Sequence, residues 1–138
     1  MKAQKLIERH EGWRSKPYKD TTGHWTVGYG FNLETVKLPQ NVGKQWLQFL
    51  IMKYSNELHN TYGWFSELDS SRQAALIDFY YNLGAGGFAS FKNMIQAFEN
   101  KNYNEAARQM LDSKWADQVG TRATDLAAII RGDNHNGI

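Results

Sequence analysis

The sequence predicts an α+β domain that is mainly helical, with a small β-hairpin lobe joined by a long helix to a helical lobe. Residues 17–31 are rich in Thr, Trp, Tyr, Val and Gly, which is typical of short strands and tight turns. Apolar residues then recur at every fourth position from Val42 to Leu58, which indicates one long helix. The remainder alternates between helical periodicity and Gly, Asn or Ser breaks. At 138 residues, the chain is long enough for one domain with its own core.

The first element is a short helix, because Ala3, Leu6 and Ile7 recur at helical spacing and Gly12 follows where a helix would stop. Glu11 is therefore expected at the C-terminal end of this helix. The strand-containing lobe is expected at about residues 13–38. Its hairpin should turn near Thr22-Gly23.

The linking helix is expected at about residues 39–61, because Pro39 suits the first turn of a helix. The helical lobe is expected to comprise about residues 62–131 together with residues 1–12. Its helices are predicted from about Asp69 to a stop at Asn82–Gly87, then over 91–99, 104–113 and 121–130.

Composition excludes several functional classes. A net charge of +2 without a concentrated basic stripe argues against a nucleic-acid binder. There are no cysteines, and the four histidines (10, 24, 59 and 135) lack metal-ligand spacing, so no metal and no cofactor are expected. Residues 1–9 lack the apolar stretch of a signal peptide, and the longest apolar run, Leu126–Ile130, is too short for a membrane span. We therefore expect synthesis in a cytosol and no membrane insertion.

Glu11, Asp20 and Thr26 are the candidate catalytic residues, separated by eight and five intervening residues. Hydrolysis of a glycosidic bond needs one acid to protonate the leaving oxygen and one base to activate water. The negative end of a helix favours the neutral form of Glu11, whereas a polar hairpin favours the ionised form of Asp20. The alternative is structural, with Glu11 a helix-end charge and Asp20 a turn former.

A longer motif surrounds these three residues: Glu-Gly-x-Arg, then Tyr-x-Asp-x-x-Gly-x-x-Thr-x-Gly-x-Gly, from Glu11 to Gly30. It resembles the signature of phage-type lysozymes, glycoside hydrolase family 24. The segments around Arg72–Leu76, Asn82–Gly84 and Tyr103–Ala107 continue the resemblance. The resemblance implies a lysozyme-like fold, with Glu11 as the general acid, Asp20 directing a water and Thr26 holding that water.

Further roles follow from the same resemblance. Arg122 matches an arginine that pairs with the catalytic Glu and supports it. Phe31, Asn32 and Met94 depart from the residues of many relatives, which affects the contacts with sugar. The substrate-binding residues expected on this basis are Gly30, Phe31, Asn32, Tyr81, Asn82, Met94 and Gln109.

The function implied by the resemblance is that of an endolysin, an endo-acting N-acetylmuramidase that cuts the β-1,4 bond of peptidoglycan. An inverting route is expected, with the two carboxyl groups roughly 6.5–9.5 Å apart. A monomer made in the host cytoplasm would reach the wall through a separate holin-type protein, and would not bind nucleic acid. A lytic transglycosylase and an inactive carbohydrate-binding module remain the alternatives.

Overall fold

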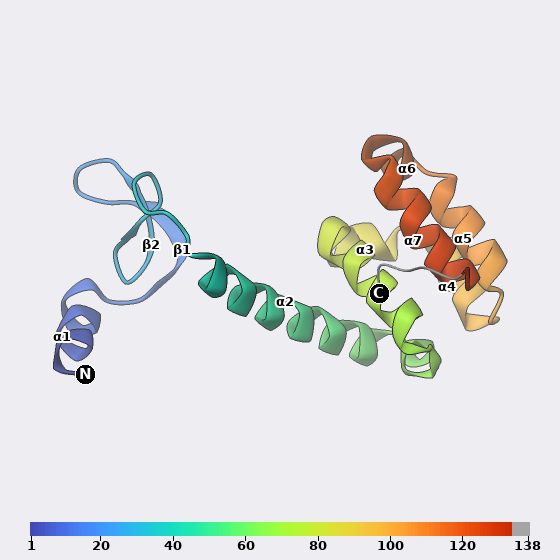
Figure 1. Ribbon diagram of the computed structural model, residues 1–138, viewed down its shortest axis with the longest axis horizontal. Helices are drawn as coiled ribbons and strands as arrows, with labels where there is room; N and C mark the ends of the chain where they lie inside the picture. The colour runs from blue at the N-terminus through green and yellow to red at the C-terminus, as the bar shows by residue number, and fades with distance from the viewer. Residues whose placement is uncertain (134–138) are drawn as a thin grey trace. The chain divides into compact units, whose positions relative to one another are not determined.

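The computed structural model describes residues 1–133, which form two compact units: residues 1–45 (the first unit) and the chain from Trp46 onward (the second unit) (Figure 1). The described part contains a three-stranded antiparallel sheet and seven α-helices, so the predicted α+β, mainly helical class is confirmed. The predicted lobe boundaries, with residues 1–12 assigned to the helical lobe, stay a prediction. The elements are α1 (Lys2–Glu11), β1 (Arg14–Lys19), β2 (Trp25–Gly28), β3 (Phe31–Asn32), α2 (Gln40–Thr61), the 3₁₀ helix η1 (Gly63–Glu67), α3 (Ser70–Ala89), α4 (Lys92–Glu99), α5 (Tyr103–Leu111), α6 (Lys114–Val119) and α7 (Thr121–Arg131).

Helix α1 ends where the sequence predicts. Gly12 has a φ of 69°, and its N–H donates to the carbonyl oxygen of Glu8 at 2.9 Å. Glycine adopts a positive φ without the steric cost that a Cβ brings, so the chain can leave the helix here. Glu11 is consequently the last residue of α1.

The sheet of the first unit has the order β1-β2-β3. Tyr18 pairs with Thr26 across β1 and β2, and Thr26 pairs with Asn32 across β2 and β3. The register of β1 against β2 shifts between Arg14 and Tyr18. Thr26 therefore lies in the central strand, just after a tight turn over residues 20–24 that agrees with the predicted hairpin turn.

Helix α2 spans 22 residues and agrees closely with the predicted linking helix. It begins in the first unit and ends in the second. Near its C-terminal end, Leu58 is completely buried and Tyr54 is partly buried against the core. Packing thus fixes the end of α2 that belongs to the second unit.

The core of the second unit is built by its helices. Helix α7 packs against α3, α5 and α6, and α4 packs against α5 (Figure 1). At the centre, the ring of Phe79 meets those of Phe88, Phe91 and Trp115 at centroid distances of 5.7, 5.0 and 4.7 Å. Aromatic rings bury large apolar areas, so this cluster is a principal source of stability.

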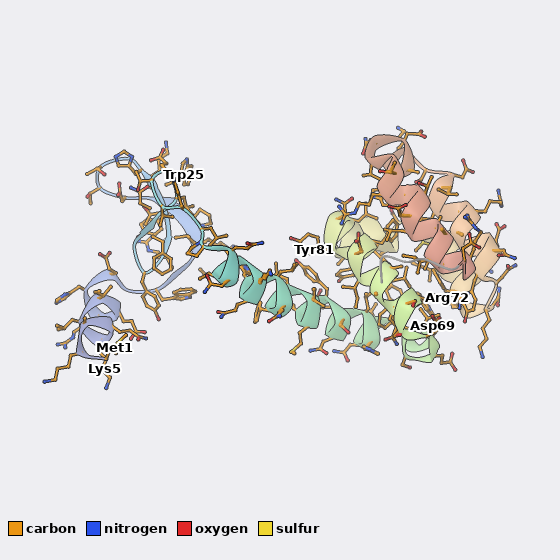
Figure 2. The ribbon with its side chains drawn as sticks, viewed as in Figure 1. Met1, Lys5, Trp25, Asp69, Arg72 and Tyr81 are labelled. Carbon is orange, nitrogen blue, oxygen red and sulfur yellow. The ribbon has the colours of Figure 1, made fainter. Side chains whose placement is uncertain are left out.

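Helix α3 begins at a well-formed cap. Asp69 accepts a hydrogen bond from the backbone N–H of Arg72, whose guanidinium also contacts the Asp69 carboxylate at 3.0 Å (Figure 2). The Nε of Arg72 donates to the carbonyl oxygen of Ile130 at 2.7 Å, which ties the start of α3 to the end of α7. The helix that begins at Ser70 is interrupted at Gly84 (φ 77°, ψ 174°), within the predicted stop at Asn82–Gly87. A second helical stretch, which the sequence did not predict, then continues α3 to Ala89.

Candidate functional site

The turn over residues 20–24, the Asp20 turn, holds a carboxylate by one of its two oxygens. Oδ1 of Asp20 accepts hydrogen bonds from the Thr22 N–H (2.9 Å), the Thr22 hydroxyl (2.8 Å) and the His24 N–H (2.9 Å). No hydrogen bond to Oδ2 is made within residues 1–133. Oδ2 is therefore the oxygen that can act on a water or a ligand.

These donors keep Asp20 ionised. The backbone N–H of His24 lowers the pKa of the Asp20 carboxyl most, followed by the Thr22 hydroxyl. Burial opposes them, and the Thr22 N–H adds a smaller lowering. Hydrogen bonds to the charged form of an acid stabilise that form. Asp20 thus has the protonation state that a base or a water-directing residue needs.

Thr26 is attached to the same turn. Its side chain is nearly buried, with 3% of the residue exposed, and its hydroxyl donates to the carbonyl oxygen of His24 at 3.0 Å. The N–H of Asp20 donates to the same carbonyl at 2.9 Å. A hydroxyl that donates in this way keeps lone pairs that can accept a hydrogen bond from water. The peptide groups of His24 therefore hold both Asp20 and Thr26.

Glu11 lies against the backbone of Gly30. Gly30 has a φ of +72°, and a Cβ built on it would lie 2.7 Å from Cδ and 3.2 Å from Oε1 of Glu11. The first distance is shorter than a real Cβ contact, so a side chain at Gly30 would force the Glu11 carboxyl group out of its observed position. The structure thus brings the end of α1 beside the connection between β2 and β3.

Phe31 and Asn32, both in β3, border this region. The ring of Phe31 covers Gly28, since a Cβ at Gly28 would lie 2.7 Å from the ring, yet Phe31 is still 51% exposed. Oδ1 of Asn32 accepts a hydrogen bond from the N–H of Glu34 at 2.9 Å. The first unit therefore contains Glu11, Asp20, Thr26, Gly30, Phe31 and Asn32.

The other predicted residues lie in the second unit. Tyr81, labelled in Figure 2, is 46% exposed on α3, and its ring forms a T-shaped pair with that of Tyr54 at a centroid distance of 6.0 Å. Asn82 follows it, and its Oδ1 accepts a hydrogen bond from the indole N–H of Trp115 at 2.6 Å. That bond orients the Asn82 amide and leaves its NH₂ group as a donor.

Met94 and Gln109 line an open hollow of about 340 Å³ between α4, α5 and α6. Met94 is completely buried, so in this structure its side chain has no surface to offer a sugar. Gln109 is partly exposed, and its Nε2 donates to Oε1 of Glu105 at 2.8 Å. Glu105 is ionised, because hydrogen bonds from Arg108 and then Gln109 lower its pKa to about 2.

Arg122 is paired within the second unit. Its Nε donates to Oδ1 of Asp78 at 2.8 Å, and its second guanidinium nitrogen lies 2.7 Å from the same oxygen. With Tyr81 and a group of apolar side chains it lines a second hollow of about 520 Å³. The pairing of Arg122 with Glu11 that the resemblance implies would join the two units, and it stays a prediction.

Thr22 was expected in the turn but without a role at the site, and His24, Glu34 and Asp78 were not expected there at all. An Asp followed two positions later by a hydroxyl residue is a local turn signal, which could have identified Thr22. His24 and Glu34, whose Nδ1 and Oε2 lie 2.6 Å apart, carry no such signal. Asp78 and Arg122 are 44 positions apart, so only the packed fold brings them together.

Within residues 1–133, no three His, Cys, Asp or Glu side chains form a group able to hold a metal ion. His135 lies outside the described residues. No helix in the described part is both long and apolar enough to cross a membrane.

Comparison with known proteins gives a consistent result. The sequence profile of the family described as phage lysozyme matches residues 8–131. The chain is 23% identical to a Dictyostelium discoideum protein named probable T4-type lysozyme 1, over 91% of each chain. It is 30% identical to the endolysin of Bacillus phage B103, over 80% of this chain and 42% of that protein. It is 26% identical to the pre-baseplate central spike protein Gp5 of Enterobacteria phage T4, over 97% of this chain and 28% of that protein.

The family match spans nearly the whole described chain and includes Glu11, Asp20 and Thr26. It also takes in the helices of the second unit that carry the remaining predicted residues. This chain therefore belongs to the phage lysozyme family of cell-wall hydrolases.

Proposed function

We propose that this protein is an endo-acting N-acetylmuramidase that hydrolyses the β-1,4 bond between N-acetylmuramic acid and N-acetylglucosamine in bacterial peptidoglycan, with inversion. Its family supports a cell-wall glycan as the substrate. The Asp20 turn is the observation that carries the proposal, because it keeps one carboxylate ionised with Oδ2 available. Inverting hydrolysis needs such a carboxylate to act on water.

The chemistry divides between two carboxyl groups. Glu11, in its protonated form, gives its proton to the glycosidic oxygen as the bond to the anomeric carbon breaks. A water held by the Thr26 hydroxyl attacks that carbon from the opposite face, and Oδ2 of Asp20 accepts its proton. The products are a new reducing end and a free sugar hydroxyl. Arg122 would support Glu11. Gly30, Phe31, Asn32, Tyr81, Asn82 and Gln109 would form the walls of the glycan site, and Met94, which is completely buried, would act only from behind that surface.

The biological role that fits this chemistry is that of an endolysin. One relative carries that name, over 80% of this chain. The protein would act as a monomer, made in the host cytoplasm and released to the wall by a separate holin-type protein. The first unit has eight Lys and Arg against four acidic residues, which suits an approach to an anionic wall.

The proposal is tested by measuring the reducing ends released from purified peptidoglycan by the native chain and by Glu11→Gln. Removal of a general acid costs about 100-fold or more, so Glu11→Gln should release almost nothing. Glu8→Gln is the matched control, since it neutralises a carboxyl one turn earlier on α1 and should retain native activity. Equal rates for native and Glu11→Gln chains would exclude Glu11 as the acid.

Product analysis separates the alternatives. Mass spectrometry should find reducing N-acetylmuramic acid ends. NMR at early times should find that the anomeric carbon of these ends has the configuration opposite to that in the substrate. Anhydro ends would instead identify a lytic transglycosylase, in which the sugar's own hydroxyl attacks. Binding to the wall without any released product would identify a binding module.

A further inference from the structure

His24 makes one side-chain contact that the proposed chemistry does not use. Its Nδ1 lies 2.6 Å from Oε2 of Glu34, and both side chains are about half exposed, at 50% and 47%. A carboxylate only accepts hydrogen bonds, so Nδ1 carries the proton and donates it. The contact joins the Asp20 turn to the segment that follows β3.

The Glu34 end of this contact is anchored to the sheet. The N–H of Glu34 donates to Oδ1 of Asn32 at 2.9 Å. The N–H of the preceding residue, Leu33, donates to the carbonyl oxygen of Trp25 in β2 at 2.8 Å. These hydrogen bonds fix the backbone at Glu34 relative to the sheet, and the Glu34 carboxylate in turn holds the His24 ring.

The His24 end carries the candidate catalytic residues. Its N–H holds Oδ1 of Asp20, and its carbonyl accepts hydrogen bonds from both Asp20 and Thr26. A rotation of the backbone at His24 would shift both residues in concert. Misplacement of a reacting group by about 1 Å can cost a large factor in rate.

We propose that the contact between His24 and Glu34 is a positioning clamp that fixes the Asp20 turn, and with it the geometry of Asp20 and Thr26 around the attacking water. His24 and Glu34 are positioning residues, since neither is assigned a contact with the sugar. The inference rests on the proposed hydrolysis, in which Asp20 acts on that water.

Two physical considerations distinguish a clamp from an ordinary surface ion pair. An exposed pair contributes little to folding stability, so loss of this one should hardly change the melting temperature. A clamp should instead change turnover, because the attacking water is placed less accurately while the sugar-binding walls stay intact. The expected result is a lower kcat with little change in KM.

The test compares Glu34→Ala, Glu34→Gln and the control Glu8→Ala in the full chain acting on purified peptidoglycan. Glu34→Ala should lower kcat by about threefold to tenfold, since placement of the water is impaired rather than abolished. Glu34→Gln should recover most of the loss, because its amide oxygen still accepts the Nδ1 hydrogen bond. Glu8→Ala should match the native chain.

His24→Ala should lower kcat as Glu34→Ala does, and the variant with both substitutions should lose no more activity than either single variant.

The titration of Asp20, followed by NMR of its carboxyl carbon, provides a second measure of whether the His24 N–H still holds the carboxylate. The charged or titratable groups near the turn are Lys19, His24 and Glu34. Loss of the negative charge of Glu34 would by itself lower the pKa of Asp20, whereas loss of positive charge on the His24 ring would raise it. Glu34→Ala and Glu34→Gln lose the same charge, so a difference between their Asp20 titrations reports the hydrogen bond. A loosened His24 N–H bond, the largest cause of the present lowering, would raise it. The clamp predicts a rise in Glu34→Ala and none in Glu34→Gln.

The outcomes separate the clamp from the proposed function. An unchanged kcat and an unchanged or lowered Asp20 pKa in Glu34→Ala would overturn the clamp, as would equal losses in the Ala and Gln variants. A native chain that releases no reducing ends would overturn the proposed hydrolysis. The Asp20 titration would then still decide whether His24 and Glu34 hold the turn.

Discussion

Within the candidate site, the backbone of Gly30 lies beside the carboxyl group of Glu11. Gly30 was expected among the substrate-binding residues, and that role stays a prediction. Glycine satisfies two requirements here, a positive φ and the lack of a Cβ. Glu11, the candidate acid, can therefore take its observed position because Gly30 has no Cβ.

Gly30→Ala should lower activity more than stability. Its Cβ would lie 2.7 Å from Cδ of Glu11 and displace the acid, so we expect at least about tenfold loss of kcat/KM in the reducing-end assay. The positive φ adds about 1–2 kcal/mol to the cost in unfolding free energy, measured by urea denaturation.

Gly23→Ala is the matched control for this substitution. Gly23 also has a positive φ, +84°, but nothing lies within 4 Å of a Cβ built there. The control should lose comparable stability and keep most of its activity. Equal activity losses in the two variants would mean that backbone strain, rather than contact with Glu11, explains the effect.

At the scale of elements, helical periodicity and glycine stops predicted most of the secondary structure. The end of α1 at Gly12 and the extent of α2 were predicted well, because each depends on local signals. The short η1 and α6 were missed, since five or six residues are too few to establish a period. The interruption of α3 at Gly84 falls within the predicted stop, but the helical stretch that follows it to Ala89 was missed, because a glycine can kink a helix as well as end it.

The candidate site was predictable only where its residues form a continuous motif. Glu11, Asp20 and Thr26 were found through their spacing, and their roles stay predictions. The partners of these residues were not found. The backbone N–H and carbonyl of His24 hold Asp20 and Thr26, and any residue has these groups. The Glu34 side chain contacts the His24 ring only once β3 has paired with β2. Side-chain identity along a single sequence does not reveal such contacts.

The Asp20 turn as an element gives a prediction about pH. The folded pKa of Asp20 lies below its ordinary value of 3.8, so its contribution to stability is present above that value and is lost as pH falls through the folded pKa. Thr22→Val removes the hydroxyl donor and should raise the folded pKa. Hydrolysis needs ionised Asp20, so the acid limb of the rate profile should move to higher pH.

Thr22→Ser is the control for this prediction, because it keeps a hydroxyl at the same position. Its acid limb should coincide with that of the native chain, whereas that of Thr22→Val should be displaced. The measurement is kcat/KM on purified peptidoglycan as a function of pH. Coinciding profiles for the Val and Ser variants would show that the Thr22 hydroxyl does not determine the protonation of Asp20 during hydrolysis.

At the scale of the whole molecule, burial is distributed unequally between the units. The buried apolar side chains of the described part all lie between Leu58 and Ile130, in the second unit. Among residues 1–45, Thr26 and Gly28 are the buried ones. A chain of 45 residues without disulfides rarely buries enough apolar surface to fold alone.

The two units should therefore differ in autonomous folding. We expect a fragment of residues 46–138 to have a helical circular dichroism spectrum and a cooperative thermal transition, because it retains the whole aromatic cluster around Phe79. A fragment of residues 1–45 should have neither, since backbone hydrogen bonds in a small sheet do not offset the entropy of ordering the chain. Met110→Asp in the longer fragment is the control: it places an unpaired charge at a completely buried position and should abolish the transition. A cooperative transition in the shorter fragment would mean that local hydrogen bonds such as those of the Asp20 turn suffice to fold the first unit.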